Sequence, residues 1–518
     1  MAKRENWGSK LGLILAMAGN AVGLGNFWRF PYQAAKHGGG AFMVPYIMAL
    51  LLLGIPIIII EWMQGRYGGK VGRGTVGHMI YLQSKEKLGP KASAILGSIC
   101  GAIIIGVVTL VNSYYLHIIG WSLGYSVLSI TGGYMDKSVS TGQFFVNYIQ
   151  SPEKVIVFWV ISVAFLGFAL ARGVQKGIEA WAKVLMPLLY IFGFLLIFKA
   201  ITLGSPVKPE WSSLKGLSYI WTPRWSELNF KTVLAACGQI FFTLSIGMGI
   251  VQNYASYLKA DDDLVVSGLC TVSLNELAEV VLGGTIVIPI TYAFMGMDGL
   301  QSGVGLTFIA LPNIFRAMGG GQFMGTMWFF MFFFAGVTSA IAMYNYVVAI
   351  LEEEMNVSRK NASIAVFFLY MIVGLPVMLE PILTKTSELV YLSELDNWVG
   401  SYLLIVVGLI EVIVAGWLFG TEKSLEETNR GAYIKVPRWF YSVIVKFVTP
   451  IIMIVVLIGS TMDYIKEGYF KVVPSFVEKF PNLIPWVNGA RIVLLTVLII
   501  GFIITYKAIM KAHKQDFA

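Results

Sequence analysis

Charged residues are scarce in this chain. They make up 13% of its 518 residues, whereas 57% are hydrophobic. Apolar runs long enough to cross a bilayer recur from end to end, which excludes a set of soluble domains and indicates a helical protein that crosses the membrane many times. The net charge of +9 does not indicate nucleic-acid binding, because the basic residues lie mostly in alternate loops, as membrane insertion requires.

Cysteine and histidine are also rare. The three cysteines, Cys100, Cys237 and Cys270, lie within apolar runs and indicate neither a disulfide framework nor a metal centre. The four histidines have no ligand spacing. The carboxylates are scattered over different spans, and no nucleophile–base pair stands out, so the sequence does not predict an enzyme.

We predict an all-α membrane protein with twelve transmembrane helices. The predicted spans are 11–36, 42–68, 92–126, 154–171, 178–201, 230–257, 263–295, 325–355, 360–382, 389–417, 438–464 and 487–510. Basic residues gather before the first span and after the second, fourth, tenth and twelfth, which predicts that both termini are cytoplasmic. The stretch 304–321 is too short to span, and we expect a hairpin that dips toward the outer face.

The first span is interrupted between Gly19 and Pro31. This stretch holds three glycines within seven residues, two asparagines and an arginine. Glycine lowers helix propensity, and irregular backbone at membrane depth survives only where it is buried in protein or lines a watery cavity. The alternative is close helix packing through Gly19 and Gly23. Packing does not explain Asn26 and Arg29, so we favour a binding site.

The sixth span is interrupted in a similar way. Its centre contains Thr243, Ser245, Gly247 and Gly249, although glycine and hydroxyl residues in a membrane helix often serve only packing. Two sets of five spans, each led by a broken helix, are typical of an inverted repeat with a binding site at the midplane. The predicted parts are a cytoplasmic segment 1–10, a first repeat 11–201, an extracellular loop 202–229, a second repeat 230–417, a cytoplasmic loop 418–437, the last two helices 438–510 and a cytoplasmic tail 511–518.

Other spans carry polar residues at membrane depth. The seventh has Asn275, Glu276 and Glu279, of which Asn275 and Glu279 share a face. A solvated position for Glu276 at a helix end is the alternative. Thr338 and Ser339 in the eighth span suit sodium, which prefers hard oxygen ligands, but they could equally bond back to their own helix.

The stretch Asn20 to Tyr32, NAVGLGNFWRFPY, resembles the first-helix signature of the neurotransmitter:sodium symporters, in particular the bacterial amino-acid members. The resemblance implies two sodium sites. The first would use Ala21, Asn26, Thr243 and Asn275 together with the substrate carboxylate. The second would use the carbonyls of Gly19, Val22 and Ala335 and the hydroxyls of Thr338 and Ser339.

The same resemblance implies a substrate site and two gates. The substrate site would comprise Ala21, Leu24, Gly25, Val111, Tyr115, Phe242, Thr243, Ser245, Met248, Ser339 and Met343. The outer gate would pair Arg29 with Asp396 and place Phe242 over Tyr115. The inner gate would join Arg4, Glu353 and Tyr257. Met248 and Met343 depart from the family pattern and leave the substrate's identity open.

The resemblance also bears on charge. Gly23 stands where amine-carrying members have an aspartate, which implies an amino acid as substrate. Glu279 stands where chloride-dependent members have a serine, which implies charge balance without chloride. We therefore expect a sodium symporter that imports a neutral, hydrophobic amino acid across the plasma membrane. Its expected partners are the substrate and the lipid bilayer, without nucleic acid, and a homodimer is compatible with the sequence. The alternatives are a sensor on the same fold and an ion channel.

Overall fold

The computed structural model describes residues 5–296, 299–300 and 303–517, and the described chain is helical apart from turns, loops and one isolated bridge between Gly39 and Pro223. Within the described residues, ten helical spans are long and apolar enough to cross a membrane in one piece. A bent pair of helices supplies the first span, and a shorter pair supplies the sixth, which together gives the twelve spans that the sequence predicts.

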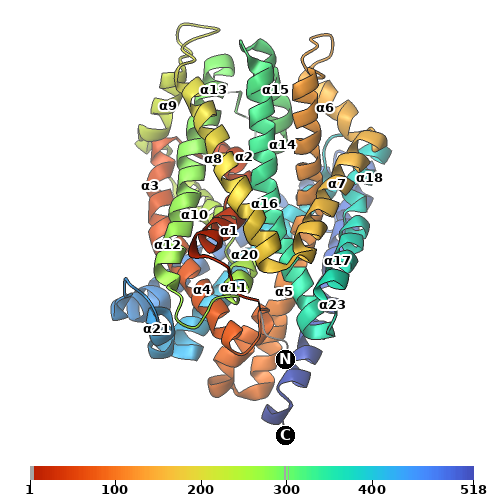
Figure 1. The fold of residues 1–518 in the computed structure, drawn as a ribbon. Coiled ribbons are helices and arrows are strands. Elements are labelled where there is room, and N and C mark those ends of the chain that lie inside the picture. The colour runs from red at the N-terminus through yellow and green to blue at the C-terminus, as the bar shows by residue number, and fades with distance from the viewer. Residues whose placement is uncertain (1–4, 297–298, 301–302, 518) are drawn as a thin grey trace.

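The first repeat occupies five spans in order (Figure 1). Its elements are α1 (Lys10–Ala21) and α2 (Leu24–Lys36); α3 (Gly40–Ala49), η1 (Leu50–Gly54) and α4 (Ile55–Lys70); α5 (Val76–Thr131); α7 (Pro152–Ala171); and η2 (Val174–Glu179) with α8 (Ala180–Ile201). The third span follows a break at Gly89, close to its predicted start at residue 92, and a separate helical segment precedes the break. Helix α5 starts at Val76 and kinks at Gly89, whose φ of 77° suits glycine, and Pro90 follows the kink.

The second repeat again begins with an interrupted span. Its elements are α10 (Phe230–Thr243) and α11 (Ile250–Ala255); α12 (Leu264–Glu276), η4 (Leu277–Gly284) and α13 (Thr285–Met295); α16 (Gly321–Met355); α17 (Arg359–Val373) and α18 (Leu375–Thr384); and α19 (Val390–Asn397), η7 (Trp398–Tyr402), α20 (Leu403–Ile413), η8 (Val414–Gly420) and α21 (Thr421–Asn429). The last two spans are η9 (Phe440–Val448) with α22 (Thr449–Glu467), and α23 (Ile484–Ala512).

Short helices cover the ends of the bundle. They are α6 (Thr141–Ile149), α9 (Ser213–Trp221), η3 (Trp225–Glu227), α14 (Gly303–Gly305), η6 (Leu306–Ala310), α15 (Leu311–Ala317), η10 (Ser475–Val477), η11 (Pro481–Leu483) and η12 (Lys514–Asp516). The predicted hairpin at 304–321 is wrong in form. Residues 303–317 make one helical segment, and a turn at Gly320 leads directly into α16.

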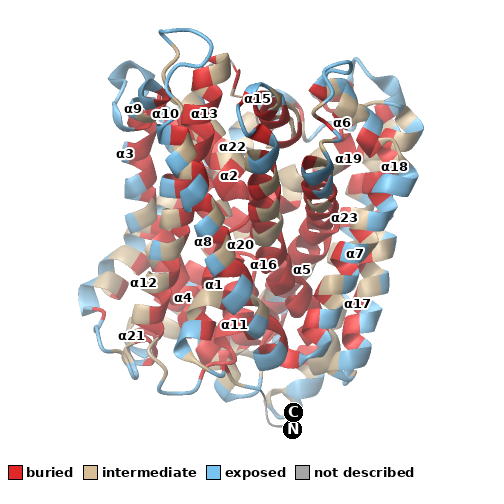
Figure 2. Ribbon diagram, turned by 45° about the horizontal axis from the view of Figure 1, so that its top comes forward, coloured by how far each residue is buried: buried red, intermediate tan, exposed pale blue. Residues whose placement is uncertain are grey.

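The core lies around α1, α5 and α16 (Figure 2). Most residues of α16 between Gly325 and Ile350 are buried, whereas outer helices such as α17 expose large apolar side chains, for example Ile372. An apolar side chain that faces lipid has no cost in a membrane, so the exposed apolar surface follows from the hydropathy of the chain.

Candidate functional site

The break in the first span lies at Val22 and Gly23. Helix α1 ends at Ala21, α2 begins at Leu24, and the two are bent by 49°. The Gly23 amide donates to the Asn26 side-chain oxygen across 2.8 Å, which satisfies a donor that the broken helix would otherwise leave free. A Cβ atom at Gly23 would lie 2.6 Å from the Tyr115 hydroxyl, so the bare backbone is what lets Tyr115 approach.

The break in the sixth span lies between Thr243 and Ile250. Ser245, Gly247 and Gly249 all have positive φ, at 54°, 75° and 74°, which ends the α-helix and exposes backbone groups. The Ser245 hydroxyl donates to the Asn20 carbonyl across 3.1 Å. The two broken spans therefore face each other and are joined by a hydrogen bond.

A cluster of buried polar groups connects the two breaks with the seventh span. The Asn26 side-chain nitrogen lies 3.0 Å from the Thr243 hydroxyl, 2.9 Å from the Asn275 oxygen and 2.9 Å from Glu279 Oε2. The Asn275 amide atom that faces the Asn26 nitrogen also lies 3.2 Å from the carbonyl oxygens of Ala21 and Thr243. With nitrogen at that position, the amide donates to both carbonyls, and its oxygen accepts from the Thr243 hydroxyl across 3.0 Å. The carbonyl, hydroxyl and amide oxygens gathered here are of the hard type that a cation such as sodium prefers.

The second predicted sodium set is also brought together in part. Gly19 packs directly on Thr338, because a Cβ atom at Gly19 would lie 2.9 Å from the Thr338 Cβ. The Thr338 hydroxyl donates to the carbonyls of Phe334 and Ala335, across 2.9 and 3.1 Å. This is the back-bonding that the sequence left as an alternative, and it leaves the hydroxyl lone pairs available to a cation.

A narrow cavity lies between the breaks. Its lining residues are Ala21, Gly23, Gly25, Asn26, Val111, Tyr115, Phe242, Ser245, Met248, Ser339 and Met343. Nine of the eleven predicted substrate residues are among them, and Leu24 and Thr243 are not. The Leu24 amide instead donates to the Tyr115 hydroxyl across 2.9 Å. No lysine, arginine, aspartate or glutamate of the described chain lines this cavity.

A larger cavity of about 460 Å³ lies at the predicted outer gate and reaches down to Tyr115 and Phe242. Arg29 and Asp396 both line it, but they are not paired. The Arg29 guanidinium lies over the Phe242 ring, 4.5 Å from its centre. Asp396 accepts from the Tyr114 hydroxyl across 2.5 Å. The predicted Arg29–Asp396 contact is therefore absent from this conformation, because each group has another partner.

Packing and hydrogen bonds join several elements at the predicted inner gate. The Trp7 indole donates to the Tyr254 carbonyl across 3.1 Å, and its ring meets Tyr254 and Tyr257 edge-on. Glu353 accepts from the Gly74 amide at 3.0 and 2.9 Å. Arg4, the predicted partner of Glu353, lies outside the described residues.

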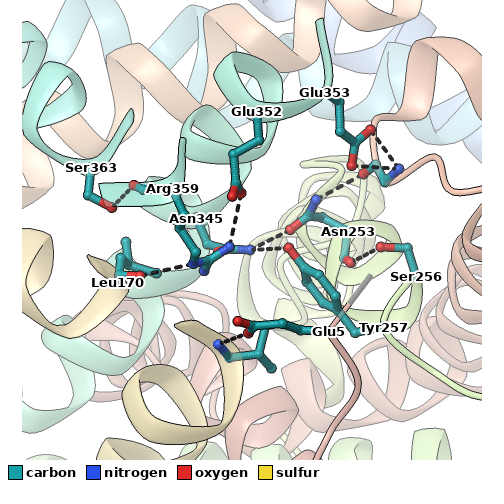
Figure 3. Close-up of polar contacts among 12 residues, drawn as sticks. Glu5, Leu170, Asn253, Ser256, Tyr257, Asn345, Glu352, Glu353, Arg359 and Ser363 are labelled. Carbon is teal, nitrogen blue, oxygen red and sulfur yellow. Dashed lines mark hydrogen bonds and ion pairs between the residues drawn. The ribbon is translucent and has the colours of Figure 1, made fainter. Parts of the chain in front are cut away.

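Sequence reasoning missed a row of polar residues beside this inner gate (Figure 3). Arg359 donates to the Asn345 oxygen across 2.6 Å, and Asn345 donates to the Asn253 oxygen across 2.7 Å. The Asn253 amide then donates to the Gly74 carbonyl across 2.9 Å. An asparagine in the middle of an otherwise apolar run, as at Asn345, was the signal that could have found it.

Two further partners of the seventh span were also missed. The Gln239 amide donates to Glu279 across 2.8 Å, and the Tyr46 hydroxyl donates to Glu276 across 2.8 Å. Glu276 is therefore engaged by a phenol inside the bundle and is not simply solvated at a helix end, although it is only partly buried. Glu279 is completely buried.

Two broken helices that meet at mid-bundle, a buried oxygen cluster between them and an outer cavity that ends on aromatic rings are the features of a secondary transporter. Comparisons with known proteins give the family. The sequence model of the sodium:neurotransmitter symporter family matches residues 4–147 and 146–511, and the chain belongs to this family.

Its relatives include sodium-dependent transporters from archaea and animals. A sodium-dependent transporter of Methanocaldococcus jannaschii, itself uncharacterized, is 33% identical over 486 residues, which cover 90% of this chain and 92% of that protein. The sodium-dependent nutrient amino acid transporter 1 of Drosophila grimshawi is 25% identical over 88% of this chain and 77% of its own. The crystal structure of MhsT in complex with L-phenylalanine matches with a TM-score of 0.76 and 30% identity, covering 88% of this chain and 100% of that one.

Proposed function

We propose that this protein is a symporter that imports a neutral, hydrophobic amino acid with sodium, by alternating access and without chloride. The observation that carries the proposal is a cavity without charged side chains that lies against a buried oxygen cluster. A zwitterion brings its own carboxylate, which can face the start of α2 and the Tyr115 hydroxyl. The partial positive charge of a helix N-terminus favours an anion there.

Sodium is a co-substrate in this proposal. Ala21, Asn26, Thr243 and Asn275 would hold one ion, and Gly19, Val22, Ala335, Thr338 and Ser339 would hold another. Each set of ligands combines residues of the first broken span with residues of other helices. An ion bound to such a set therefore favours the arrangement in which the first span and those helices are close together. The substrate carboxylate would complete the first set, and sodium and substrate would then raise each other's affinity to the same extent.

The side chain of the substrate would lie against Val111, Phe242, Met248 and Met343. Methionine is flexible and adapts to irregular shapes, so we propose weak discrimination among aliphatic, methionine-like and aromatic amino acids. One methylene is worth only about 1–3 kcal/mol in such a pocket. Two similar proteins support this proposal: MhsT, whose crystal structure contains L-phenylalanine, and the sodium-dependent nutrient amino acid transporter 1.

The packing at the predicted inner gate and the cavity at the predicted outer gate support an outward-facing conformation. The loop charges support termini in the cytoplasm, and the proposed location is the plasma membrane. Residues 202–229 would then be extracellular. Helix α9 and the residues after it pack against Gly39 and Gly40, where a Cβ atom at Gly40 would lie 2.5 Å from the Thr222 backbone.

Counterflow in proteoliposomes tests the proposal. Vesicles preloaded with leucine, methionine or phenylalanine should exchange labelled leucine only when sodium is present. Lysine, glutamate and the decarboxylated analogue of phenylalanine should not compete at equal concentration. A channel or a sensor would show no counterflow. Competition by the decarboxylated amine as strong as that by phenylalanine would overturn the amino-acid assignment.

A further inference from the structure

A second group of buried polar residues lies outside the cavity and the two sodium sets. Glu61 on α4 and Glu411 on α20 are both completely buried. One oxygen of each carboxyl group binds the inner part of the sixth span. The Gly247 amide donates to Glu61 Oε1 across 2.6 Å, and the Gln252 amide donates to Glu411 Oε1 across 2.6 Å.

The other oxygens of the two carboxyl groups have no donor. Glu61 Oε2 and Glu411 Oε2 are buried without a hydrogen-bond partner in the described chain, and so are Gln64 Oε1 and Gln252 Oε1. The two carboxyl groups themselves are within hydrogen-bonding reach of each other. Buried acceptors that meet without a donor are costly, and an added proton converts such a contact into a strong O–H···O⁻ bond.

The surroundings supply no compensating cation. Neither carboxyl group forms an ion pair with a lysine, arginine or histidine in the part of the chain that the structure describes. The titratable groups that face Glu411 from neighbouring helices are the Cys100 thiol on α5 and the Tyr346 phenol on α16. A thiol and a phenol can lose a proton but cannot gain a positive charge, so neither offsets a carboxylate. Two ionised carboxylates side by side in such a place would repel each other.

The pair also lies where the sixth span docks on α4. A Cβ atom at Gly65 would be 2.3 Å from the Gln252 carbonyl, and one at Gly69 would be 2.2 Å from the Ser256 carbonyl. These glycines let the backbone of α11 and the residue after it lie directly on α4. Glu61 and Gln252 lie in the same contact between α4 and α11, so the charge of the carboxyl pair affects how strongly α11 docks on α4.

We propose that Glu61 and Glu411 form a proton-binding site that holds one shared proton while α11 is docked on α4. With the proton bound, the pair carries one negative charge and keeps its hold on Gly247 and Gln252. When the proton leaves to water, the pair carries two negative charges, and their repulsion weakens the docking. The site thereby couples proton concentration to the inner half of the sixth span, apart from any role of sodium or substrate.

Infrared spectroscopy of the full chain in lipid tests the proposal without a transport assay. The C=O stretch of a protonated carboxyl group is separate from the carboxylate bands and shifts in heavy water. Glu411→Gln and Glu61→Gln should each remove the same single protonated-carboxyl band, and the double variant should remove no more. Glu380→Gln is the matched control, because Glu380 is a buried carboxyl group that caps the Val390 and Tyr391 amides at a distant point. It should leave the band of the pair in place.

The pH dependence of thermal unfolding gives a second reading. A folded state that holds one extra proton loses stability as the pH rises, by up to about tenfold in the folding equilibrium per pH unit. The wild type should therefore lose stability toward alkaline pH, and Glu411→Gln should not. If Glu411→Gln does not fold, Glu61→Gln serves as the variant in this measurement. In the infrared spectra, the proposal is overturned if the variants lose carboxylate bands and no protonated-carboxyl band, or if Glu61 and Glu411 each give a separate protonated band. In the unfolding measurement, it is overturned if stability has the same pH dependence in the wild type and the variant.

Discussion

The Arg29 guanidinium lies over the Phe242 ring at 4.5 Å, while Asp396 is held by the Tyr114 hydroxyl across the same outer cavity. A guanidinium over an aromatic face is stabilised by the ring quadrupole, and a carboxylate gains from a phenol donor. Both contacts lie in the lining of a cavity of about 460 Å³. The predicted outer gate would form if Arg29 and Asp396 exchanged these partners for each other.

A double-mutant cycle should detect that exchange. Arg29→Gln and Asp396→Asn should weaken amino-acid binding in sodium, and their effects should be strongly non-additive because one variant already removes the pair. We expect a coupling of about 0.5–3 kcal/mol, which is the usual range for residues in contact. Thermal stability without sodium and substrate is the control, since the two residues are not in contact in this conformation and their effects should add. Additive effects on binding would show that the pair does not form.

The sequence predicted the positions of both breaks because glycine and polar residues are seldom tolerated together at membrane depth unless they bind a ligand or let another group approach. Gly23 and Gly247 show this, since a side chain at either position would collide with Tyr115 or with the Leu404 backbone. The sequence could not predict the partner of Arg29. Phe242 and Asp396 are both within its reach, and the choice depends on how the helix bundles are arranged, which no local pattern encodes.

The helical segment before the third span shows a second limit. Residues 76–88 are mixed in polarity, so hydropathy did not predict that they form a helix, which the break at Gly89 separates from the third span. The pairing of Glu61 with Glu411 was also out of reach. These residues lie 350 positions apart, and only the packing of α20 against α4 and α5 brings them together.

Removing the hydroxyls of the second sodium set should weaken the response to sodium. In the combined variant Thr338→Ala with Ser339→Val, the sodium concentration for half-maximal amino-acid binding should rise at least about tenfold, which corresponds to about 1.4 kcal/mol. The reason is the loss of two oxygen ligands from a set without a formal charge. A sodium titration of labelled leucine binding measures the change.

Thr326 provides the matched control, because its hydroxyl makes the same hydrogen bond to the carbonyl four residues earlier in α16, to Gln322 across 2.9 Å. Thr326→Val should leave the sodium titration unchanged. If the double variant folds and its titration is also unchanged, Thr338 and Ser339 are not sodium ligands.

The C-terminal tail should dock in a pH-dependent way. The His513 ring lies 4.6 Å from the Tyr81 ring and is tilted against it by 32°. Its Nε2 lies 3.4 Å from His78 Nδ1, and Lys85 donates to Asp516 across 2.7 Å. Burial and the positive charges nearby lower the pKa of His513 from 6.5 to about 4. The docked tail therefore binds fewer protons than the free tail between these values, and docking should weaken as the pH falls from about 6.5 toward 4.

A nitroxide label at the exposed Gln515, introduced as cysteine, can follow this docking. Its mobile fraction should increase several-fold on acidification, since one linked proton changes the equilibrium by up to about tenfold per pH unit. His513→Phe keeps a ring beside Tyr81 but cannot titrate, and it should remove the pH response in this range. A response that persists in His513→Phe would assign it to another group, and the inference about His513 would fail.

The final prediction concerns the negative charge beside the first sodium set. Glu279 accepts from Asn26 across 2.9 Å and from Gln239 across 2.8 Å, and it is completely buried. Two sodium ions and a zwitterion would bring a net charge of +2 into this region, and uncompensated buried charge is costly. An ionised Glu279 would offset part of that charge, and adjacent sodium would favour its ionised form. Chloride would then have no place in the cycle.

Glu279→Ser should convert the protein to chloride dependence. Uptake by the variant in an inert large anion should fall at least about tenfold, because removal of one partner from a buried charge pair typically costs about 3–5 kcal/mol. Chloride should restore uptake, since the space left by the carboxylate offers the Asn26 and Gln239 amides to an anion. Glu276→Gln is the control, as Glu276 binds Tyr46 and should not create a need for chloride. Full activity of Glu279→Ser in both salts would show that the charge at this position is dispensable, and inactivity in both would show that Glu279 serves the fold or the site in another way.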